Sequence, residues 1–194
     1  YPRNELLKDQ LRSTLDYAEK TQNAFVASRG FGLSIAPFFG PLPVNAQRLL
    51  NQQHEQSWQR RGPGFICPFL KCPTCGTGEM QWMETDVQAG KEQLSCVRGG
   101  CDGFLGSERI RLTRKSMLEE PPDILFTTTE MLNRNLSSGE YRKLFGVGVS
   151  GSPGLVLLDE IHTYGGGAGA QTGLLLRRWR KLAGKWPHYV GLSA

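Results

Sequence analysis

Two acidic residues stand together where an apolar run ends. The run 155–158 leads directly into Asp159 and Glu160, and His162 follows two positions later. One carboxylate can hold Mg²⁺ through the waters of the ion, and its neighbour can orient the water that attacks a phosphate. We therefore interpret Asp159 as a ligand of nucleotide-bound Mg²⁺ and Glu160 as the residue that activates water. His162 would hydrogen-bond the γ-phosphate region or a residue of a facing domain. The alternative is that the acidic pair simply begins a solvated loop.

All five cysteines fall within one short segment. Cys72 and Cys75 flank a Pro-Thr turn, and Cys96 and Cys101 form a second pair after 20 intervening residues. Two separated thiolate pairs with this spacing are typical of a four-cysteine zinc site. The sequence predicts Zn²⁺ bound by these four residues, with Cys67 either replacing one of them or staying a free thiol. An iron–sulfur cluster and buried unliganded thiols are the alternatives.

The composition excludes several classes of protein. The 194 residues are 39% hydrophobic and 21% charged and contain no long apolar run, so neither a membrane partner nor wholesale disorder is expected. Basic residues outnumber acidic ones by 23 to 18, which gives a formal net charge of +5 and suits a polyanionic partner. Cysteines at metal-binding spacing indicate a reducing compartment, so we expect a cytoplasmic protein.

Strand and helix patterns alternate on both sides of the cysteine segment. Apolar residues recur every three to four positions over 3–20, which predicts a helix. Strands are predicted at 33–39, 124–127, 155–158 and 189–192, and further helices at 44–61, 130–136, 140–144 and 170–183. The glycines of 165–169 are expected to form a mobile loop. This alternation indicates an α/β domain with a parallel sheet covered on both faces.

The cysteine segment itself contains few aliphatic residues. A metal ion would have to compensate for its sparse core. We therefore expect residues 65–107 to be a small inserted zinc-ribbon-like module. Residues 1–64 and 108–194 would form the surrounding α/β domain, with the acidic motif in its second part.

Asp159-Glu160-Ile161-His162 resembles motif II of the DEAD/DEAH-box helicases of superfamily 2. Three other segments resemble further motifs of this family in the family's order: 2–6 resembles motif Ia, 122–132 motif Ib, and 191–194 the beginning of motif III. Arg3 and Asn4 depart from the frequent form of motif Ia, and Thr129 stands where motif Ib usually has proline. The cysteine insert beside the motif Ib segment is also similar to large bacterial helicases of phage-defence systems.

The resemblance implies the first RecA-like domain of an ATP-dependent nucleic acid helicase or translocase. Asp159 and Glu160 would bind Mg²⁺ and ATP, and together with His162 they would form the catalytic site. Nucleic acid contacts, to DNA rather than RNA, are implied for Pro2, Arg3, Asn4, Thr127, Thr128 and Thr129, and coupling of hydrolysis to movement for Ser193 and Ala194. From physics alone, an equally good interpretation is that these are strand-favouring residues plus an N-cap, with Thr129 capping the helix that starts near Glu130.

The family's phosphate-binding loop, G-x-x-x-x-G-K-[ST], does not occur in these 194 residues. The resemblance therefore implies an incomplete domain, with this loop before Tyr1 and a second RecA-like domain after Ala194 as its partner. Such a fragment would be inactive alone. The competing hypothesis is a non-enzymatic zinc-ribbon module that binds nucleic acid on an α/β scaffold.

Basic and aromatic side chains supply further candidates for nucleic acid contact. Trp58 or Trp82 would stack on a base, and phosphates would be bound by Arg98, Arg109, Arg111, Arg114 and Lys115. The alternative is that these charges form an ordinary solvated face. The predicted helix 170–183 and the residues just after it carry five basic residues and no acid. Its charged face either meets a phosphate backbone or the second domain, or is an ordinary solvated surface.

Overall fold

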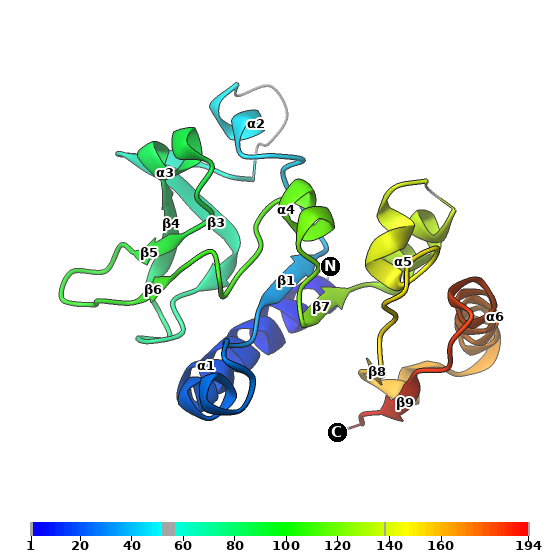
Figure 1. Cartoon of the computed structure of the whole chain (residues 1–194). Helices are drawn as coiled ribbons and strands as arrows, with labels where there is room; N and C mark the ends of the chain where they lie inside the picture. Colours follow the sequence, from blue (N-terminus) through cyan, green and yellow to red (C-terminus); the bar gives the residue numbers. More distant parts are fainter. Residues whose placement is uncertain (1, 52–56, 138, 194) are drawn as a thin grey trace. The chain divides into compact units, whose positions relative to one another are not determined.

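The computed structural model describes residues 2–51, 57–137 and 139–193, with the side chains of 2–4 outside this description (Figure 1). The chain divides into two compact units, Tyr1–Thr127 and Thr128–Ala194. Each unit is mixed α/β, and each is described by itself. Within the described residues, no helix is long and apolar enough to cross a membrane.

The first unit begins with one long helix. Helix α1 (Pro2–Arg29) covers the predicted range 3–20 and continues nine residues further, because no helix breaker occurs before Gly30. Gly30 ends the helix in the left-handed conformation, with φ of +81°, and its N–H group donates to the carbonyl of Val26. Leu11 and Leu15, four positions apart, are fully buried on one face of α1.

Two strands of the first unit form a parallel pair. Strand β1 (Ile35–Phe38) is buried along its whole length and pairs with β7 (Ile124–Thr127), with Ile35 opposite Ile124. On its other side, Ile35 forms a parallel bridge with Ile110. The chain therefore leaves β1 at Phe38 and returns beside the beginning of the same strand before it reaches β7.

The largest sheet lies within this excursion, and it is antiparallel throughout. Its order is β2 (Arg60–Arg61), β3 (Gly64–Lys71), β4 (Glu79–Met83), β5 (Leu94–Cys96) and β6 (Phe104–Leu105). Three short helices accompany it: α2 (Gln47–Leu50), α3 (Glu84–Ala89) and α4 (Arg114–Glu119). The division into compact units does not separate this sheet from β1 and β7, so the predicted module limits 65 and 107 stay a prediction.

An aromatic core holds this sheet together. The rings of Trp58 and Trp82 pack edge to face with 5.8 Å between their centroids, and Phe69 packs against Trp58 at 5.6 Å. Both tryptophans are buried. Of the predicted helix over 44–61, only Gln47–Leu50 is helical among the described residues, and 52–56 lie outside them. The last part is not helical because Trp58 packs in this core and Arg60 begins β2.

The second unit contains one strand–helix–strand crossover. Strand β8 (Leu155–Leu158) runs parallel to β9 (His188–Gly191), and helix α6 (Gly166–Ala183) connects them. Helix α5 (Thr129–Leu136) and the 3₁₀ turns η1 (Tyr141–Phe145) and η2 (Ile161–Thr163) complete the unit. Trp179 of α6 is buried against Phe145, and its indole N–H group donates to the carbonyl of Phe145 at 2.7 Å.

The predicted glycine loop over 165–169 is instead largely helical. Helix α6 begins at Gly166, four residues earlier than expected. Gly169 lies against the carbonyl of Tyr164, where an added Cβ atom would come within 2.1 Å of the oxygen. The glycines therefore let the first turn of α6 pack closely on the preceding backbone.

The expected RecA-like parallel sheet is not shown by the described residues. Parallel pairing is confined to two separate two-stranded pairs, β1–β7 and β8–β9, while the five-stranded sheet is antiparallel. The apolar pattern of 155–158 also predicted burial on both faces, yet Leu155 and Leu157 are exposed. The broad α/β class is confirmed, and the finer RecA-like arrangement stays a prediction.

Candidate metal centre and acidic motif

The four predicted cysteines come together at one end of the antiparallel sheet. The Sγ atoms of Cys72, Cys75, Cys96 and Cys101 all lie within 4.8 Å of one another. Cys72 and Cys101 are separated by 3.8 Å between their sulfurs, and Cys75 and Cys96 also by 3.8 Å. Four thiolates bonded at ~2.3 Å around a tetrahedral Zn²⁺ ion are ~3.8 Å apart. These residues can therefore hold a metal ion, and their arrangement suits zinc.

Two tight backbone turns present the sulfurs. After β3, the N–H group of Gly76 donates to the carbonyl of Cys72, and the N–H group of Cys72 donates to the carbonyl of Gly78. Gly76 has φ of +73°, a conformation that glycine adopts without strain. On the other side, Cys96 ends β5 and its N–H group donates to the carbonyl of Gly103. Each turn carries one pair of ligands.

Two glycines pack directly on the sulfurs, and the sequence analysis did not identify them. A Cβ atom at Gly78 would lie 2.4 Å from Cys96 Sγ, and one at Gly103 would lie 2.3 Å from Cys72 Sγ. The backbone of Gly78 also donates a hydrogen bond to Cys75 Sγ at 3.2 Å. Their positions shortly after Cys75 and Cys101 could have identified them from the sequence, because close approach of the backbone to a ligand atom requires glycine.

Backbone amides favour the thiolate form at one ligand. The N–H groups of Thr77 and Gly78 lower the pKa of the Cys75 thiol to about 6. Burial, followed by the neighbouring thiols, raises the pKa of Cys96 to about 12. The two backbone N–H groups thus favour the thiolate form of Cys75. Thiolates are the form that binds a metal, so binding must release the remaining protons.

Cys67 lies outside the cluster. It is buried, and burial raises the pKa of its thiol to about 12. The alternative in which Cys67 replaces one of the four ligands is therefore not favoured, since all four predicted positions already converge. Cys67 is instead a buried thiol of strand β3.

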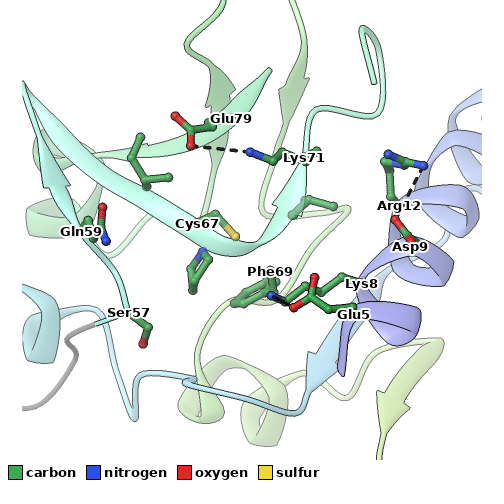
Figure 2. Close-up of a pocket in the computed structure, with 13 residues that line it drawn as sticks. Glu5, Lys8, Asp9, Arg12, Ser57, Gln59, Cys67, Phe69, Lys71 and Glu79 are labelled. Atoms are coloured by element: carbon green, nitrogen blue, oxygen red, sulfur yellow. Dashed lines mark hydrogen bonds and ion pairs between the residues drawn. The ribbon is translucent and has the colours of Figure 1, made fainter. Parts of the chain in front are cut away.

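A cavity of about 460 Å³ lies beside Cys67, between α1 and β3 (Figure 2). Lys8, Arg12 and Lys71 line this cavity. Each of them has a carboxylate partner, which is Glu5 at 2.7 Å, Asp9 at 3.8 Å and Glu79 at 3.6 Å respectively. Because the charges in the wall are paired, the cavity is not arranged to select an anion or a cation.

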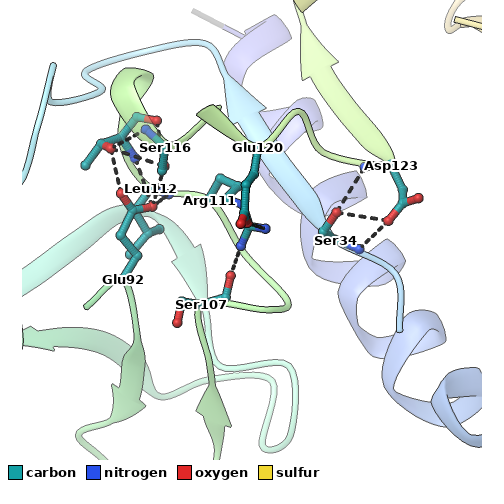
Figure 3. Close-up of polar contacts among 9 residues, drawn as sticks. Ser34, Glu92, Ser107, Arg111, Leu112, Ser116, Glu120 and Asp123 are labelled. Atoms are coloured by element: carbon teal, nitrogen blue, oxygen red, sulfur yellow. Dashed lines mark hydrogen bonds and ion pairs between the residues drawn. The ribbon is translucent and has the colours of Figure 1, made fainter. Parts of the chain in front are cut away.

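The cysteine-bearing sheet is anchored to the rest of its unit by Glu92 (Figure 3). This buried carboxylate accepts hydrogen bonds from the backbone N–H groups of Leu112 and Thr113 and from the hydroxyls of Thr113 and Ser116. A buried carboxylate with this many donors is satisfied by the protein itself. Glu92 thus fixes the segment before β5 to the start of α4.

The acidic motif lies at the carboxyl end of β8 in the second unit. Asp159 and Glu160 follow Leu158 directly, and both are half-buried. The Glu160 carboxylate lies 3.1 Å from His162 Nε2, while His162 Nδ1 lies 3.0 Å from the hydroxyl of Ser193. Ser193 itself follows the carboxyl end of β9. The fold thus brings Glu160, His162 and Ser193, three of the predicted residues, into one chain of polar contacts.

The backbone of this turn is unusual at Glu160. Its φ of +51° makes it the one non-glycine residue with positive φ in the described part of the chain. The following N–H group, of Ile161, donates to the carbonyl of Leu192 at 2.9 Å, and the Ile161 side chain packs where a Cβ atom of Gly191 would lie. The turn is therefore held against β9 in a conformation that an L-residue rarely adopts.

The predicted nucleic acid contacts are placed differently. Thr127 donates its hydroxyl hydrogen to the carbonyl of Phe38, and the Thr128 hydroxyl accepts from the N–H group of Met131 as the N-cap of α5. Thr129 is the first residue of α5. The N-cap is therefore Thr128 and not the predicted Thr129, and phosphate contact stays a prediction. The backbone of Pro2, Arg3 and Asn4 is helical, with side chains outside the described residues, and Ala194 lies outside them entirely.

Trp58, Trp82, Arg109 and Arg111, which were proposed to contact nucleic acid, make contacts within the first unit instead. Stacking by Trp58 or Trp82 is excluded because both are buried in the sheet core. Arg109 is buried and lies 2.9 Å from Glu19, and Arg111 pairs with Glu120. These arginines hold the unit together, since their charges are neutralised within it.

None of the family models, curated proteins and solved structures with which the chain was compared matches it. Its function must therefore be argued from its own residues.

Proposed function

We propose that this chain is part of the first RecA-like domain of an ATP-dependent nucleic acid helicase or translocase, and that its four cysteines bind a structural zinc ion. The observation that carries the enzymatic part is the hydrogen bond between His162 and Ser193. It joins the segment similar to motif II with the segment similar to motif III, 31 positions apart. Both segments lie at the carboxyl ends of adjacent parallel strands, where α/β sheets place their ligands.

The residues of the acidic motif divide the work. Asp159 would hold Mg²⁺, which when bound neutralises phosphate charge. Glu160 would orient the water for attack on the terminal phosphate. His162 lies 3.1 Å from the Glu160 carboxylate, so it holds that carboxylate in position. The Ser193 hydroxyl contacts the other ring nitrogen of the same imidazole, so its position would depend on whether the site is occupied.

The zinc ion would support the fold rather than react. Four cysteine ligands leave no open coordination position for substrate, as in structural zinc sites. Cys72, Cys75, Cys96 and Cys101 come from turns after β3 and β5 and from the loop before β6. Zinc would thus join the ends of three strands in a sheet that otherwise relies on one small aromatic core.

Hydrolysis is tested by Glu160→Gln in the full-length protein. The expected result is loss of nucleic-acid-stimulated ATP hydrolysis by about 100-fold or more, with binding of nucleic acid retained. The matched control is Glu140→Gln, which removes an exposed carboxylate of the same unit and should leave the rate unchanged. An unchanged rate in Glu160→Gln would remove Glu160 from the mechanism.

A non-enzymatic zinc-ribbon module is the second candidate, favoured by the convergence of the four sulfurs. It predicts nucleic acid binding that depends on the metal, without ATP hydrolysis. Zinc removal with a chelator should then abolish nucleic acid binding. If the enzymatic proposal is right, binding should persist in part through the second unit.

A further inference from the structure

The positive charge of this protein is concentrated in its second unit. Residues 128–194 contain eight Lys or Arg and four Asp or Glu, whereas residues 1–127 contain 15 and 14. The second unit therefore carries four of the five excess charges. No acidic residue follows Glu160, so α6 and the segment after it are purely basic.

Trp186 stands just after α6 and is 75% exposed. The three other tryptophans, Trp58, Trp82 and Trp179, are all buried. An exposed indole ring does not contribute the favourable free energy that its burial in the core would give. Its exposure next to a basic helix is therefore a feature to be explained.

The ring of Trp186 is held in a defined position. The guanidinium carbon of Arg180 lies 3.5 Å from the ring centroid, so one face of the indole is covered by a cation. Gly184 ends α6 with φ of +67°, and its N–H group donates to the carbonyl of Arg180 at 3.1 Å. Pro187 follows and restricts the backbone. The ring is thus preorganised, with its remaining surface open.

Two further cations of α6 are exposed and lie on the same side of the helix. Arg177 and Lys181 are four positions apart, which places them one turn, ~6 Å, from each other along the axis. None of the ion pairs found among the described residues involves either of them. Arg178, by contrast, donates to Asn133 and Ser137 of the same unit. Arg177 and Lys181 are therefore available to external anions.

We propose that Trp186, Arg180, Lys181 and Arg177 form a binding platform for a single nucleic acid strand. A base stacks on the open part of the indole ring, and the adjoining phosphates meet the two exposed cations. A flat aromatic ring with neighbouring positive charges is the arrangement that recognises single strands without reading their sequence. An acidic peptide would use the charges but would have no need of the ring.

This platform is distinct from the acidic motif. Trp186 precedes β9 at its amino end, whereas Ser193 follows the carboxyl end of the same strand. A strand of four residues spans ~13 Å. The platform therefore lies at the opposite end of the β8–β9 pair from Asp159 and Glu160, and the inference does not depend on ATP hydrolysis.

Fluorescence titration with a short oligothymidylate tests the platform directly. Trp186 is the tryptophan that solvent reaches, so stacking should quench the exposed part of the emission. Trp186→Ala should remove this quenching and weaken binding at least about fivefold, while Trp186→Phe should restore most of the affinity. Lys181→Gln should reduce the slope of log K against log salt concentration by about 0.7.

The matched control is Tyr17→Ala in the first unit. Tyr17 is 68% exposed, and its ring centroid lies 6.0 Å from Lys20 Nζ. Lys20, however, is paired with Asp16. This variant should bind oligothymidylate as the unmodified chain does. Equal weakening in both variants would show that any exposed aromatic ring contributes, which would overturn the proposal.

Three other outcomes would also overturn it. The first is binding of oligothymidylate without quenching. The second is unchanged affinity in Trp186→Ala. The third is tighter binding of an oligoglutamate than of oligothymidylate, which would identify an acidic peptide as the partner. Loss of ATP hydrolysis in Glu160→Gln is an independent result, so failure of the platform and failure of the enzymatic proposal can be told apart.

Discussion

The imidazole Nδ1 atom of His162 lies 3.0 Å from the hydroxyl oxygen of Ser193. The two residues are distant in sequence, and they meet because β8 and β9 are parallel neighbours whose carboxyl ends point the same way. Backbone hydrogen bonds from Ile161 to Leu192 and from Leu192 to Leu158 fix the two turns against each other. A displacement of one turn should therefore displace the other.

Replacement of one cluster cysteine should remove the metal. Purified protein is expected to contain about one zinc ion per chain, and Cys75→Ser should lose it and unfold the antiparallel sheet more easily, because four thiolates are needed for a closed site. Elemental analysis and thermal unfolding measure the two effects. Cys67→Ser is the control: it should keep its zinc, since Cys67 is outside the cluster.

Gly103→Ala should weaken metal binding although it leaves every ligand in place. The new Cβ atom would lie 2.3 Å from Cys72 Sγ and 3.2 Å from Thr74 Oγ1, so the ligand turn must move. We expect a loss of about 1–3 kcal/mol in the free energy of unfolding of the metal-bound protein. Gly99→Ala lies in the same loop with no atom near its Cβ position, and it should be neutral. Similar behaviour of the two variants in a chelator competition would contradict this explanation.

The backbone conformation of Glu160 predicts an unusual order of stabilities. At φ of +51°, Glu160→Asn should be at least as stable as the original chain, whereas Glu160→Val should lose about 1 kcal/mol or more. Chemical denaturation of the variants measures the difference. Glu119 lies within α4 on ordinary helical backbone, where Asn and Val have similar propensities, so Glu119→Asn and Glu119→Val should not show this order.

Asp123 should make stability depend on pH in the acid range. Partial burial acts to raise its pKa, but hydrogen bonds from Arg29 and Ser34 outweigh it, so the pKa of this carboxyl lies below its ordinary value. A lowered folded-state pKa stabilises the fold above the unfolded value of about 3.9, and this contribution disappears as the pH falls through the folded-state pKa.

Asp123→Asn should therefore lower the free energy of unfolding by about 1 kcal/mol at neutral pH, a modest effect because the Arg29–Asp123 pair is open to solvent. The difference from the original chain should vanish at acid pH. Denaturation curves at a series of pH values test both statements. Asp9→Asn, which removes a carboxylate 70% exposed, should show little difference at any pH.

Local patterns predicted much of the fold and of the metal centre. The four cysteines converge as expected because each pair is set by a turn of a few residues, and short-range spacing is visible in sequence. The ranges 124–127, 155–158 and 170–183 likewise coincide with β7, β8 and most of α6.

Long-range packing accounts for what the sequence could not predict. The polar stretch ending at Arg61 looked helical, but Trp58 is drawn into an aromatic core with Trp82 and Phe69, which are distant in sequence. The glycine-rich segment before Ala170 has the composition of a loop. Glycine is required there by the close approach of Gly169 to Tyr164, a contact that depends on the folded conformation. Antiparallel pairing of β2–β6 also depends on partners that periodicity does not identify.

The return of the chain to β1 has a consequence for how this protein can vary. Ile110 pairs with Ile35, so the stretch between Phe38 and Arg109 leaves strand β1 and ends beside the same strand. This stretch therefore forms a closed ring. The entropic cost of such a ring grows slowly, by only about 0.6 kcal/mol for each doubling of its length. A change in the length of this stretch should therefore cost the β1–β7 pair little chain entropy, as long as the contacts of Glu92 are kept.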